Sequence, residues 1–299
     1  MTAAATPAGT SSPRPSTRTR WLGRLGVHLS LIVLVILWLI PTIGLLINSF
    51  RPPDLVSKTG WWTAIFEPTQ FTLANYATVL AESNIGPAFV NSLIISIPAT
   101  IIPVMVAAFA AYAFAWMKFP GRNLLFVAVV GLLVVPLQTT LIPVLQLFGP
   151  KGLGIAGSFL AVWLAHTAYG LPFAIFLLRN FMGELPREVF ESASIDGASP
   201  VTSFLRLALP MSVPAIAALA IFQFLFVWND LLVALVYIGA ANAENLPLTV
   251  LIANLVNSLG GGWQLLAAAA FISMALPLAV FFALQRYFVR GIVGGSVKG

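Results

Sequence analysis

Acidic side chains are concentrated in one short stretch of this 299-residue chain, between two apolar segments. Four of the nine aspartates and glutamates lie there: Glu184, Glu188, Glu191 and Asp196. Such a cluster offers charge for recognition by another protein. The stretch from Glu184 to Pro210 therefore indicates a docking surface, and the alternative is that its carboxylates only solvate a loop.

Local signals divide this stretch into two short helices. Pro186 suits the start of the first helix, and glutamates follow in its first turns. Gly197 permits a break, after which Ser199 can cap a second helix that starts at Pro200. The buried side of the first helix is predicted to be an apolar series at four-residue spacing, Leu185, Val189 and Ala193.

A second polar group, Trp228-Asn229-Asp230, lies inside an apolar segment that we predict to cross the membrane. A lone carboxylate in a bilayer costs about 2.5 to 3.5 kcal/mol, so such residues usually face an aqueous path or a partner. An aromatic face beside two polar groups suits a sugar ring. Counted from Met211 at about 1.5 Å per residue, Asp230 would lie about 28 Å along a helix, near the membrane surface. Asp230 could therefore also point outward or bond a neighbouring helix, and Trp228 could be an interfacial anchor.

Signatures of enzymes are absent from the sequence. There is no Gly-x4-Gly-Lys-Ser/Thr loop, no His-Glu-x2-His motif and no Gly-x-Ser-x-Gly elbow. The lack of cysteine excludes disulfides and thiolate metal sites. His28 lies at the edge of a span and His166 inside one, where helix packing or a hydrogen bond in a pathway could explain it. We predict no catalytic residue, no metal site and no cofactor on this chain.

The composition is that of a membrane protein. Hydrophobic residues make up 59% of the chain, charged residues 8%, and the mean hydropathy is +0.97, whereas soluble domains are about 25% charged. Apolar runs of about twenty residues, the length that crosses a bilayer as a helix, predict six spans. They lie near Val27–Asn48, Pro87–Trp116, Leu124–Leu147, Gly157–Leu178, Met211–Tyr237 and Trp263–Leu284.

Lysines and arginines alternate between the two sides of these spans. Of the fifteen, only Arg51, Lys58 and Lys151 fall on one side, which leaves twelve on the side of the termini. Because basic residues favour the cytoplasmic side of short loops, both termini are predicted to be cytoplasmic and the number of spans even. The net charge of +6 then lies near anionic lipid headgroups, and nothing indicates nucleic acid as a partner.

Three further patterns describe the termini and the helices. Residues 1–24, rich in Thr, Ala, Pro, Ser and Arg, predict a disordered cytoplasmic tail. A signal peptide is disfavoured, because the apolar run that follows is long enough to span. Prolines inside the spans predict bends or static kinks. A stripe of small residues, Ala107, Ala111 and Ala115, predicts a close contact between helices.

The stretch from Glu184 to Pro210 resembles the EAA loop of ATP-binding-cassette importer permeases, whose pattern is Glu-Ala-Ala, three residues, Gly, nine residues, an aliphatic, one residue and Leu-Pro. The matching residues are Glu191-Ser192-Ala193-Ser194-Ile195-Asp196-Gly197-Ala198-Ser199 and Leu207-Ala208-Leu209-Pro210, with mild departures at Ser192 and Leu207. Further similarities are Asn91-Ser92, the turn at 118–122, Pro136, Pro143, Trp228-Asn229-Asp230 and the ending 285–299. The turn and the ending are similar to the carbohydrate branch, in the subunit that resembles the smaller maltose permease component.

This resemblance implies an all-α permease domain over residues 25–299, with six spans in the type I importer fold, in a bacterial-type cytoplasmic membrane. A second, non-identical permease would complete the pathway, two ATPase subunits would bind ATP and Mg, and an extracytoplasmic solute-binding protein would deliver the solute. The residues expected to couple to the ATPase are Glu188, Glu191, Ala193, Asp196, Gly197, Ala198 and Pro210. Those expected along the solute pathway are Trp228, Asn229 and Asp230.

The resemblance leaves the solute and one loop open. A sugar or oligosaccharide is expected, and a polyol or glycerol phosphate is the alternative. A channel or a secondary transporter is the rival class, but such carriers place coupling charges at the midplane of several helices, and this chain does not show that pattern. The aromatic loop from Arg51 to Gly86 could lie against the membrane or against the binding protein.

Overall fold

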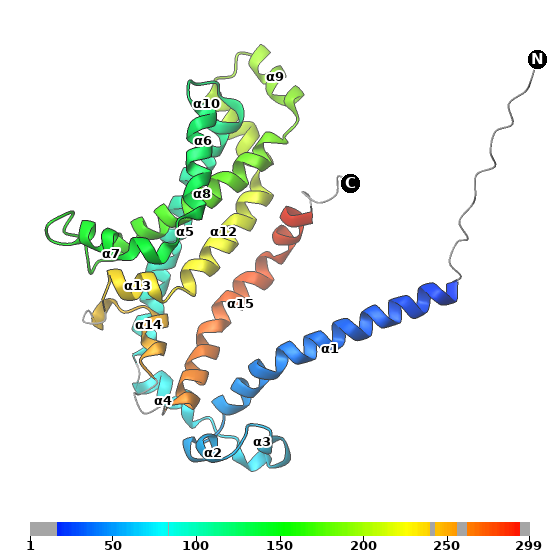
Figure 1. The fold of residues 1–299 in the computed structure, drawn as a ribbon, viewed down its shortest axis with the longest axis vertical. Coiled ribbons are helices and arrows are strands. Elements are labelled where there is room, and N and C mark those ends of the chain that lie inside the picture. Colours follow the sequence, from blue (N-terminus) through cyan, green and yellow to red (C-terminus); the bar gives the residue numbers. More distant parts are fainter. Residues whose placement is uncertain (1–16, 83, 240–242, 256–261, 294–299) are drawn as a thin grey trace, which may run out of the picture.

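The structure is a computed structural model that describes residues 17–82, 84–239, 243–255 and 262–293. Every regular element in these ranges is a helix, so the predicted all-α class is confirmed (Figure 1). The elements are α1 (Thr17–Ser49), α2 (Pro53–Lys58), α3 (Thr63–Phe66), η1 (Pro68–Gln70), α4 (Ala74–Glu82), α5 (Ile85–Trp116), α6 (Arg122–Gly131), η2 (Leu132–Val134), α7 (Leu137–Phe148), α8 (Phe159–Gly183), α9 (Arg187–Ile195), α10 (Pro200–Ser203), η3 (Phe204–Ala208), α11 (Leu209–Met211), α12 (Val213–Trp228), α13 (Leu232–Tyr237), η4 (Ala243–Asn245), α14 (Leu248–Ala253) and α15 (Trp263–Val293).

Four helical segments in the described residues are long and apolar enough to cross a bilayer. They are Leu25–Ser49 of α1, all of α5, all of α8, and Trp263–Gln285 of α15, and they correspond to the predicted first, second, fourth and sixth spans. Two further helix pairs pass the same test but are sharply bent. The described chain thus has four such spans, or up to six if each bent pair crosses once.

The predicted third span, Leu124–Leu147, is sharply bent in the structure, at one of the prolines expected to bend it. Its two halves, α6 with η2 and then α7, meet at 103°. Pro136 has no N–H to bond the preceding turn, and the residue before a proline is pushed out of the helical region. Val135 accordingly has an extended ψ of 116°, and the chain turns there.

The predicted fifth span, Met211–Tyr237, is wrong as one helix. Helix α12 covers only Val213–Trp228, and α13 begins separately at Leu232. Asparagine and aspartate favour helix ends because their side chains bond main-chain groups there. Asp230 therefore lies at a break between two helices, together with Asn229, and not inside a span.

Helices α5 and α8 form the centre of the bundle and run side by side in the same direction. The indole N–H of Trp163, near the start of α8, donates to the carbonyl oxygen of Ile94 at 2.9 Å. The indole N–H of Trp116, at the end of α5, donates to the carbonyl oxygen of Met182 at 2.9 Å. The two helices are thus tied together at both ends of their contact.

Small side chains line this contact and let the two backbones approach closely. Ala107 and Ala111 of α5 are completely buried, in one cluster with Ala174 and Leu178 of α8. Ala115 packs at the partly buried edge of the same cluster. The close helix contact predicted for the alanine stripe is confirmed.

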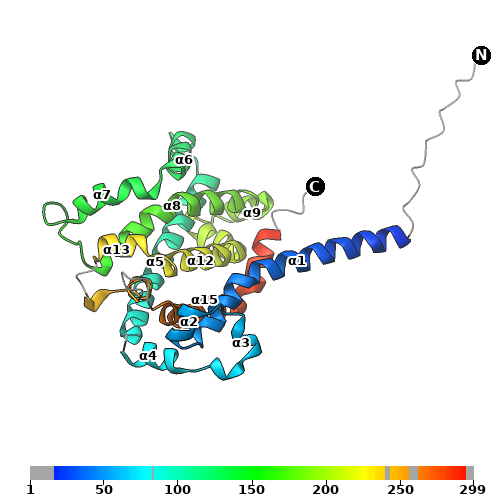
Figure 2. The ribbon, with the colours of Figure 1, turned by 60° about the horizontal axis from the view of Figure 1, so that its bottom comes forward.

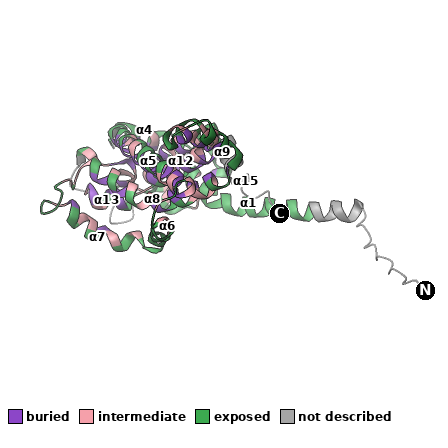
Figure 3. Cartoon of the chain, turned by 90° about the horizontal axis from the view of Figure 1, so that it is seen from above, coloured by how far each residue is buried: buried purple, intermediate pink, exposed green. Residues whose placement is uncertain are grey.

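Helix α1 reaches away from the bundle. It packs on α15 near its own end, and residues 25–43 are all exposed (Figures 1 and 3). Trp38, the largest of these side chains, is 81% exposed. Helix α1 begins at Thr17, inside the segment predicted as a tail, and residues 1–16 lie outside the described residues.

Between α1 and α5 the chain forms a small module, α2 to α4, around the side chain of Arg51. Arg51 is completely buried, and burial lowers the pKa of its guanidinium from its usual value. The guanidinium donates to Gln70 Oε1 and Asn48 Oδ1 at 3.0 Å and to the carbonyl oxygens of Thr59 and Leu55 at 3.3 Å. Neutral oxygen atoms thus satisfy this buried charge.

The module rests on α15 beside the end of α1 (Figure 2). Trp61 packs against Gly44 of α1, whereas Trp62, Phe66 and Phe71 are exposed. The exposed aromatic residues fit both predicted neighbours of the module, the membrane surface and a binding protein.

The predicted orientation can be tested in a chain that has no cysteine. Helices α2 to α4 lie at one end of the bundle, and α9 and α10 lie at the other (Figure 1). Single cysteines at the exposed positions Trp62, Lys151 and Glu244 should react with a membrane-impermeant thiol reagent in intact cells. Cysteines at Lys118 and Glu188 should react only after the cells are opened. Labelling of position 188 from outside would show that the orientation is reversed.

Candidate functional site

The stretch predicted as a docking surface folds into the two short helices that were expected. Pro186 directly precedes the first residue of α9. At the start of α10, Ser199 Oγ accepts a hydrogen bond from the main-chain N–H of Thr202 at 3.2 Å, as expected of a capping serine. Both predicted helix starts are confirmed.

Gly197 ends α9 with a φ of +79°, in the left-handed region where glycine alone is free of strain. Its N–H donates to the carbonyl oxygen of Ser194 at 3.1 Å, and the N–H of Ala198 donates to that of Ala193 at 2.9 Å. These two bonds form a Schellman motif. Ala193 and Ala198 are half-buried beneath the turn.

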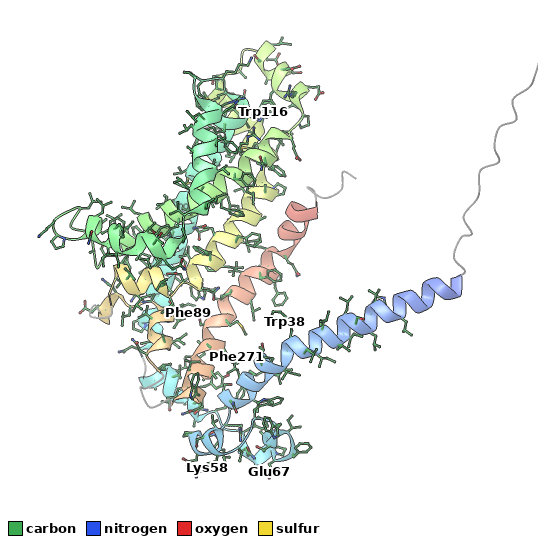
Figure 4. All side chains as sticks on the ribbon, viewed as in Figure 1. Trp38, Lys58, Glu67, Phe89, Trp116 and Phe271 are labelled. Atoms are coloured by element: carbon green, nitrogen blue, oxygen red, sulfur yellow. The ribbon has the colours of Figure 1, made fainter. Side chains whose placement is uncertain are left out.

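One face of α9 is fixed to the end of α5 (Trp116 is labelled in Figure 4). The ring of Phe190, which is buried, stacks on Trp116 with centroids 3.9 Å apart and planes at 21°. Leu185 is buried as predicted, but Val189 is 36% exposed. The predicted buried series is thus wrong at Val189. Phe190 takes that place because Trp116, far away in the sequence, is held there by its bond to Met182.

The other face of α9 and α10 carries exposed acidic and apolar side chains. Glu188, Glu191 and Asp196 are exposed, and none of them forms an ion pair in the described structure. Ile195 and Val201 are 86% and 65% exposed. Large apolar side chains exposed beside charged ones are typical of surfaces that bind another protein, and the docking role of this stretch stays a prediction. We name these five residues the coupling surface, after that predicted role.

A π-helical turn, Phe204–Ala208, connects the coupling surface to α12. Phe204 is buried, and its ring lies 4.8 Å from that of Phe109 and 5.2 Å from that of Tyr112 on α5. Pro210, expected among the coupling residues, is exposed in α11, just before the chain bends by 73° into α12. No feature of the sequence predicted this π turn.

The three residues predicted along the solute pathway have different surroundings. Trp228 is buried inside the bundle, where its indole N–H donates to the carbonyl oxygen of Ser273 at 3.3 Å and its ring meets that of Phe89 edge-on at 5.3 Å. It is therefore not an interfacial anchor. Asn229 is exposed and donates to the carbonyl oxygen of Leu225 in its own helix at 2.8 Å. A role of either residue toward solute stays a prediction.

Asp230 connects three helices. Its Oδ2 atom accepts from the main-chain N–H of Ala234 in α13 at 3.1 Å and lies 3.7 Å from Nε2 of His166 in α8. Its carbonyl oxygen accepts from Thr249 Oγ1 in α14 at 2.6 Å. His166 is buried, and its Nδ1 atom has no hydrogen-bond partner among the described residues. The contacts of Asp230 agree with the alternative in which it bonds neighbouring helices.

Asn91 and Ser92, noted above only for a resemblance, fasten the segment that precedes α14. Asn91 Nδ2 donates to the carbonyl oxygens of Glu244 and Leu246 at 2.8 and 3.1 Å. Ser92 Oγ accepts from the main-chain N–H of Leu248 at 2.8 Å. Two adjacent polar side chains in an apolar span need partners, and that signal could have predicted this attachment.

Residues 101–294 match the family described as binding-protein-dependent transport system inner membrane component. The osmoprotective compounds uptake permease protein GgtD of Synechocystis sp. is 57% identical to this chain over 284 residues, which covers 94% of each protein. The alpha-glucoside transport system permease protein AglG of Rhizobium meliloti is 43% identical, and the match covers 91% of this chain and 97% of that one.

The fold is similar to that of a chain in a crystal structure of a bacterial ABC transporter involved in the import of the acidic polysaccharide alginate. The TM-score is 0.73 at 18% identity, and the match covers 93% of this chain and 100% of that one. A chain of the alginate transporter in complex with its alginate-bound periplasmic protein gives a TM-score of 0.70 at 14% identity. At these identities the likeness concerns the fold alone.

The stack of Phe190 on Trp116 predicts that the coupling surface detaches when the ring is removed. Replacing a buried phenylalanine by alanine costs about 3 to 5 kcal/mol, so Phe190→Ala should speed protease cleavage between residues 184 and 210 of the purified chain at least tenfold. Ile195→Ala removes an exposed side chain and should leave the cleavage rate unchanged. Equal cleavage rates in both variants would contradict the anchoring role of Phe190.

The contacts of Asp230 predict a packing defect on truncation. A hydrogen bond between membrane helices contributes about 0.6 kcal/mol on average, so Asp230→Ala should lower the melting temperature of the purified complex only slightly. Asp230→Asn keeps an acceptor oxygen for Ala234 and should lower it less. Solute uptake per assembled complex should persist in both variants. A large loss of uptake in a stable complex would instead show a role in the pathway.

Proposed function

The chain belongs to the binding-protein-dependent transport system inner membrane components, and from this we propose that it lines the pathway of an ATP-driven sugar importer in a bacterial cytoplasmic membrane. The observation that carries the proposal is the coupling surface. This acidic and apolar face is exposed, yet it is anchored to α5 and continues into α12. A face with these properties can bind a partner and pass on the partner's movement.

Movement of the coupling surface would reach the spans as a rigid-body motion. Phe190 is stacked on the end of α5, and the π turn leads into α12 while Phe204 packs on α5. We expect the ATPase dimer, which would bind ATP and Mg, to pair a basic side chain with Glu191. Its closure on nucleotide would then move α5 and α12 and switch the side from which the pathway is open.

A second, non-identical permease and a solute-binding protein complete the proposed importer. The exposed side chains of α1 at 25–43 leave apolar surface for another membrane-embedded chain as well as for lipid. The module α2 to α4 lies at the end opposite to α9 (Figure 1), and we place the binding protein there. The similar alginate transporter is in complex with a periplasmic protein, which supports such a partner.

The proposed solute is a neutral polyhydroxylated compound such as an alpha-glucoside. One relative is named for alpha-glucoside transport, and another for the uptake of osmoprotective compounds, which keeps a polyol as the alternative. The spans support an uncharged solute. The four unbroken spans contain no aspartate or glutamate, and Arg179, near the α9 end of α8, is their sole lysine or arginine.

Coupling is tested by two substitutions that leave the spans intact. Glu191→Lys reverses the charge of the coupling surface, and Gly197→Leu puts a side chain at a φ that costs an L-residue roughly 1 to 2 kcal/mol. Both variants should stay in the membrane. However, the amount of ATPase that copurifies should fall at least tenfold, and ATP hydrolysis should no longer respond to an alpha-glucoside and the binding protein.

The matched control is Glu244→Lys, which makes the same charge change on an exposed residue outside the coupling surface. It should retain the ATPase and the stimulated hydrolysis. Normal coupled transport in both Glu191→Lys and Gly197→Leu would refute the docking assignment.

A further inference from the structure

A small pocket lies in the turn between α5 and α6, at the end of the bundle that carries α9. Its volume is about 360 Å³, and its lining is continuous in sequence apart from one proline: Lys118, Phe119, Gly121, Arg122, Asn123 and Leu124. None of these residues belongs to the coupling surface or takes part in the proposed coupling mechanism.

Two cations border this pocket without a carboxylate beside them. Lys118 is exposed and Arg122 is half-buried, and no aspartate or glutamate in the described residues lies within 4.0 Å of either one. One Arg122 guanidinium nitrogen donates to the carbonyl oxygen of Met117 at 3.1 Å, which fixes the side chain across the turn. A second donor group of the same guanidinium stays available for an anion.

The turn itself is held in place. The ring of Phe119 lies 5.9 Å from that of Phe114, which is buried in the core between α5 and α8. Gly121 takes a φ of +76° and lets the chain reverse into α6. The cations are thus presented by a fixed loop, and the pocket does not depend on a flexible arm.

The surroundings select the kind of anion. Directly beside the pocket, α6 exposes Leu124, Leu125 and Val127 at 76%, 52% and 65%, and α6 lies at the edge of the bundle (Figures 2 and 3). A phosphate held by the cations would have apolar side chains next to it for acyl chains. Basic pockets at the ends of membrane helices bind phosphate headgroups of lipids in this way.

We propose that the turn from Lys118 to Leu124 is a binding site for the phosphate of an anionic phospholipid, with Lys118 and Arg122 on the phosphate and the exposed face of α6 along the acyl chains. The site does not depend on the proposed coupling to an ATPase. It would hold one lipid at a defined place next to α5 and α8.

Lipid binding can be measured on the purified full chain in neutral detergent by native mass spectrometry. The chain is titrated with phosphatidylglycerol or with phosphatidylcholine of the same acyl chains. We expect one phosphatidylglycerol to bind at least tenfold more tightly than phosphatidylcholine, and the preference to disappear in a Lys118→Gln, Arg122→Gln double variant. A Lys58→Gln, Lys151→Gln variant makes the same charge change elsewhere and should keep the preference.

Three outcomes of this titration would overturn the proposal: equal binding of the two lipids, equal loss in the control variant, and complete displacement of phosphatidylglycerol by millimolar inorganic phosphate. The last of these would indicate a free-anion site. Copurification of the ATPase from membranes gives a further test: if the double variant loses the ATPase but keeps the lipid preference, the turn is a protein contact and the proposal is wrong. If the double variant does not fold, the exposed Lys118→Gln substitution is used alone. It should reduce the preference for phosphatidylglycerol over phosphatidylcholine, and an unchanged preference would contradict the proposal.

Discussion

Helices α5 and α8 can lie close to each other because alanines at 107, 111 and 174 occupy part of the contact between them, beside larger side chains such as Leu178. In lipid, apolar side chains gain little by leaving the surrounding hydrocarbon, so helices associate through close packing and through polar bonds. Both are present here, since the indoles of Trp163 and Trp116 each bond a carbonyl oxygen of the other helix. Helix α12 is joined to this pair by Gln223, whose side-chain amide donates to the carbonyl oxygen of Ala99 in α5 and lies against Gly170 of α8.

The two ends of this central pair carry different attachments. At one end, Trp116 bonds α8 through its indole N–H and stacks on Phe190 of α9. One residue thus joins α5 to α8 and also anchors the coupling surface. At the other end, the side chains of Asn91 and Ser92 hold the start of α14 and the segment before it through hydrogen bonds to main-chain groups. A shift of α5 relative to its neighbours would therefore be felt at both ends of the bundle. The proposed coupling, in which a partner bound at one end changes the opening of the pathway, requires this property.

Hydropathy alone predicted the four unbroken spans, and turn chemistry predicted the ends of α9 and α10, because prolines, Gly197 and Ser199 act on their own neighbours. A bend was predicted at the prolines inside the spans, Pro136 among them, but its size was not, because a proline can kink a helix mildly or break it and the surrounding packing decides which. The face of α9 was misassigned because its partner, Trp116, is distant in sequence. The position of Asp230 depended on a helix that ends at Trp228, a boundary that apolar composition does not reveal.

The module around Arg51 has a consequence for the order in which the chain is built. The guanidinium's partners lie within residues 48–70, so their bonds can form as soon as that part of the chain has been made. The helix on which α1 and the module rest is α15, which follows every other described helix in the chain. Until α15 has been made, α1 must persist in lipid without that neighbour. Residues 25–43 of α1 are exposed on every face and largely apolar, so the helix can stay in lipid without a partner helix.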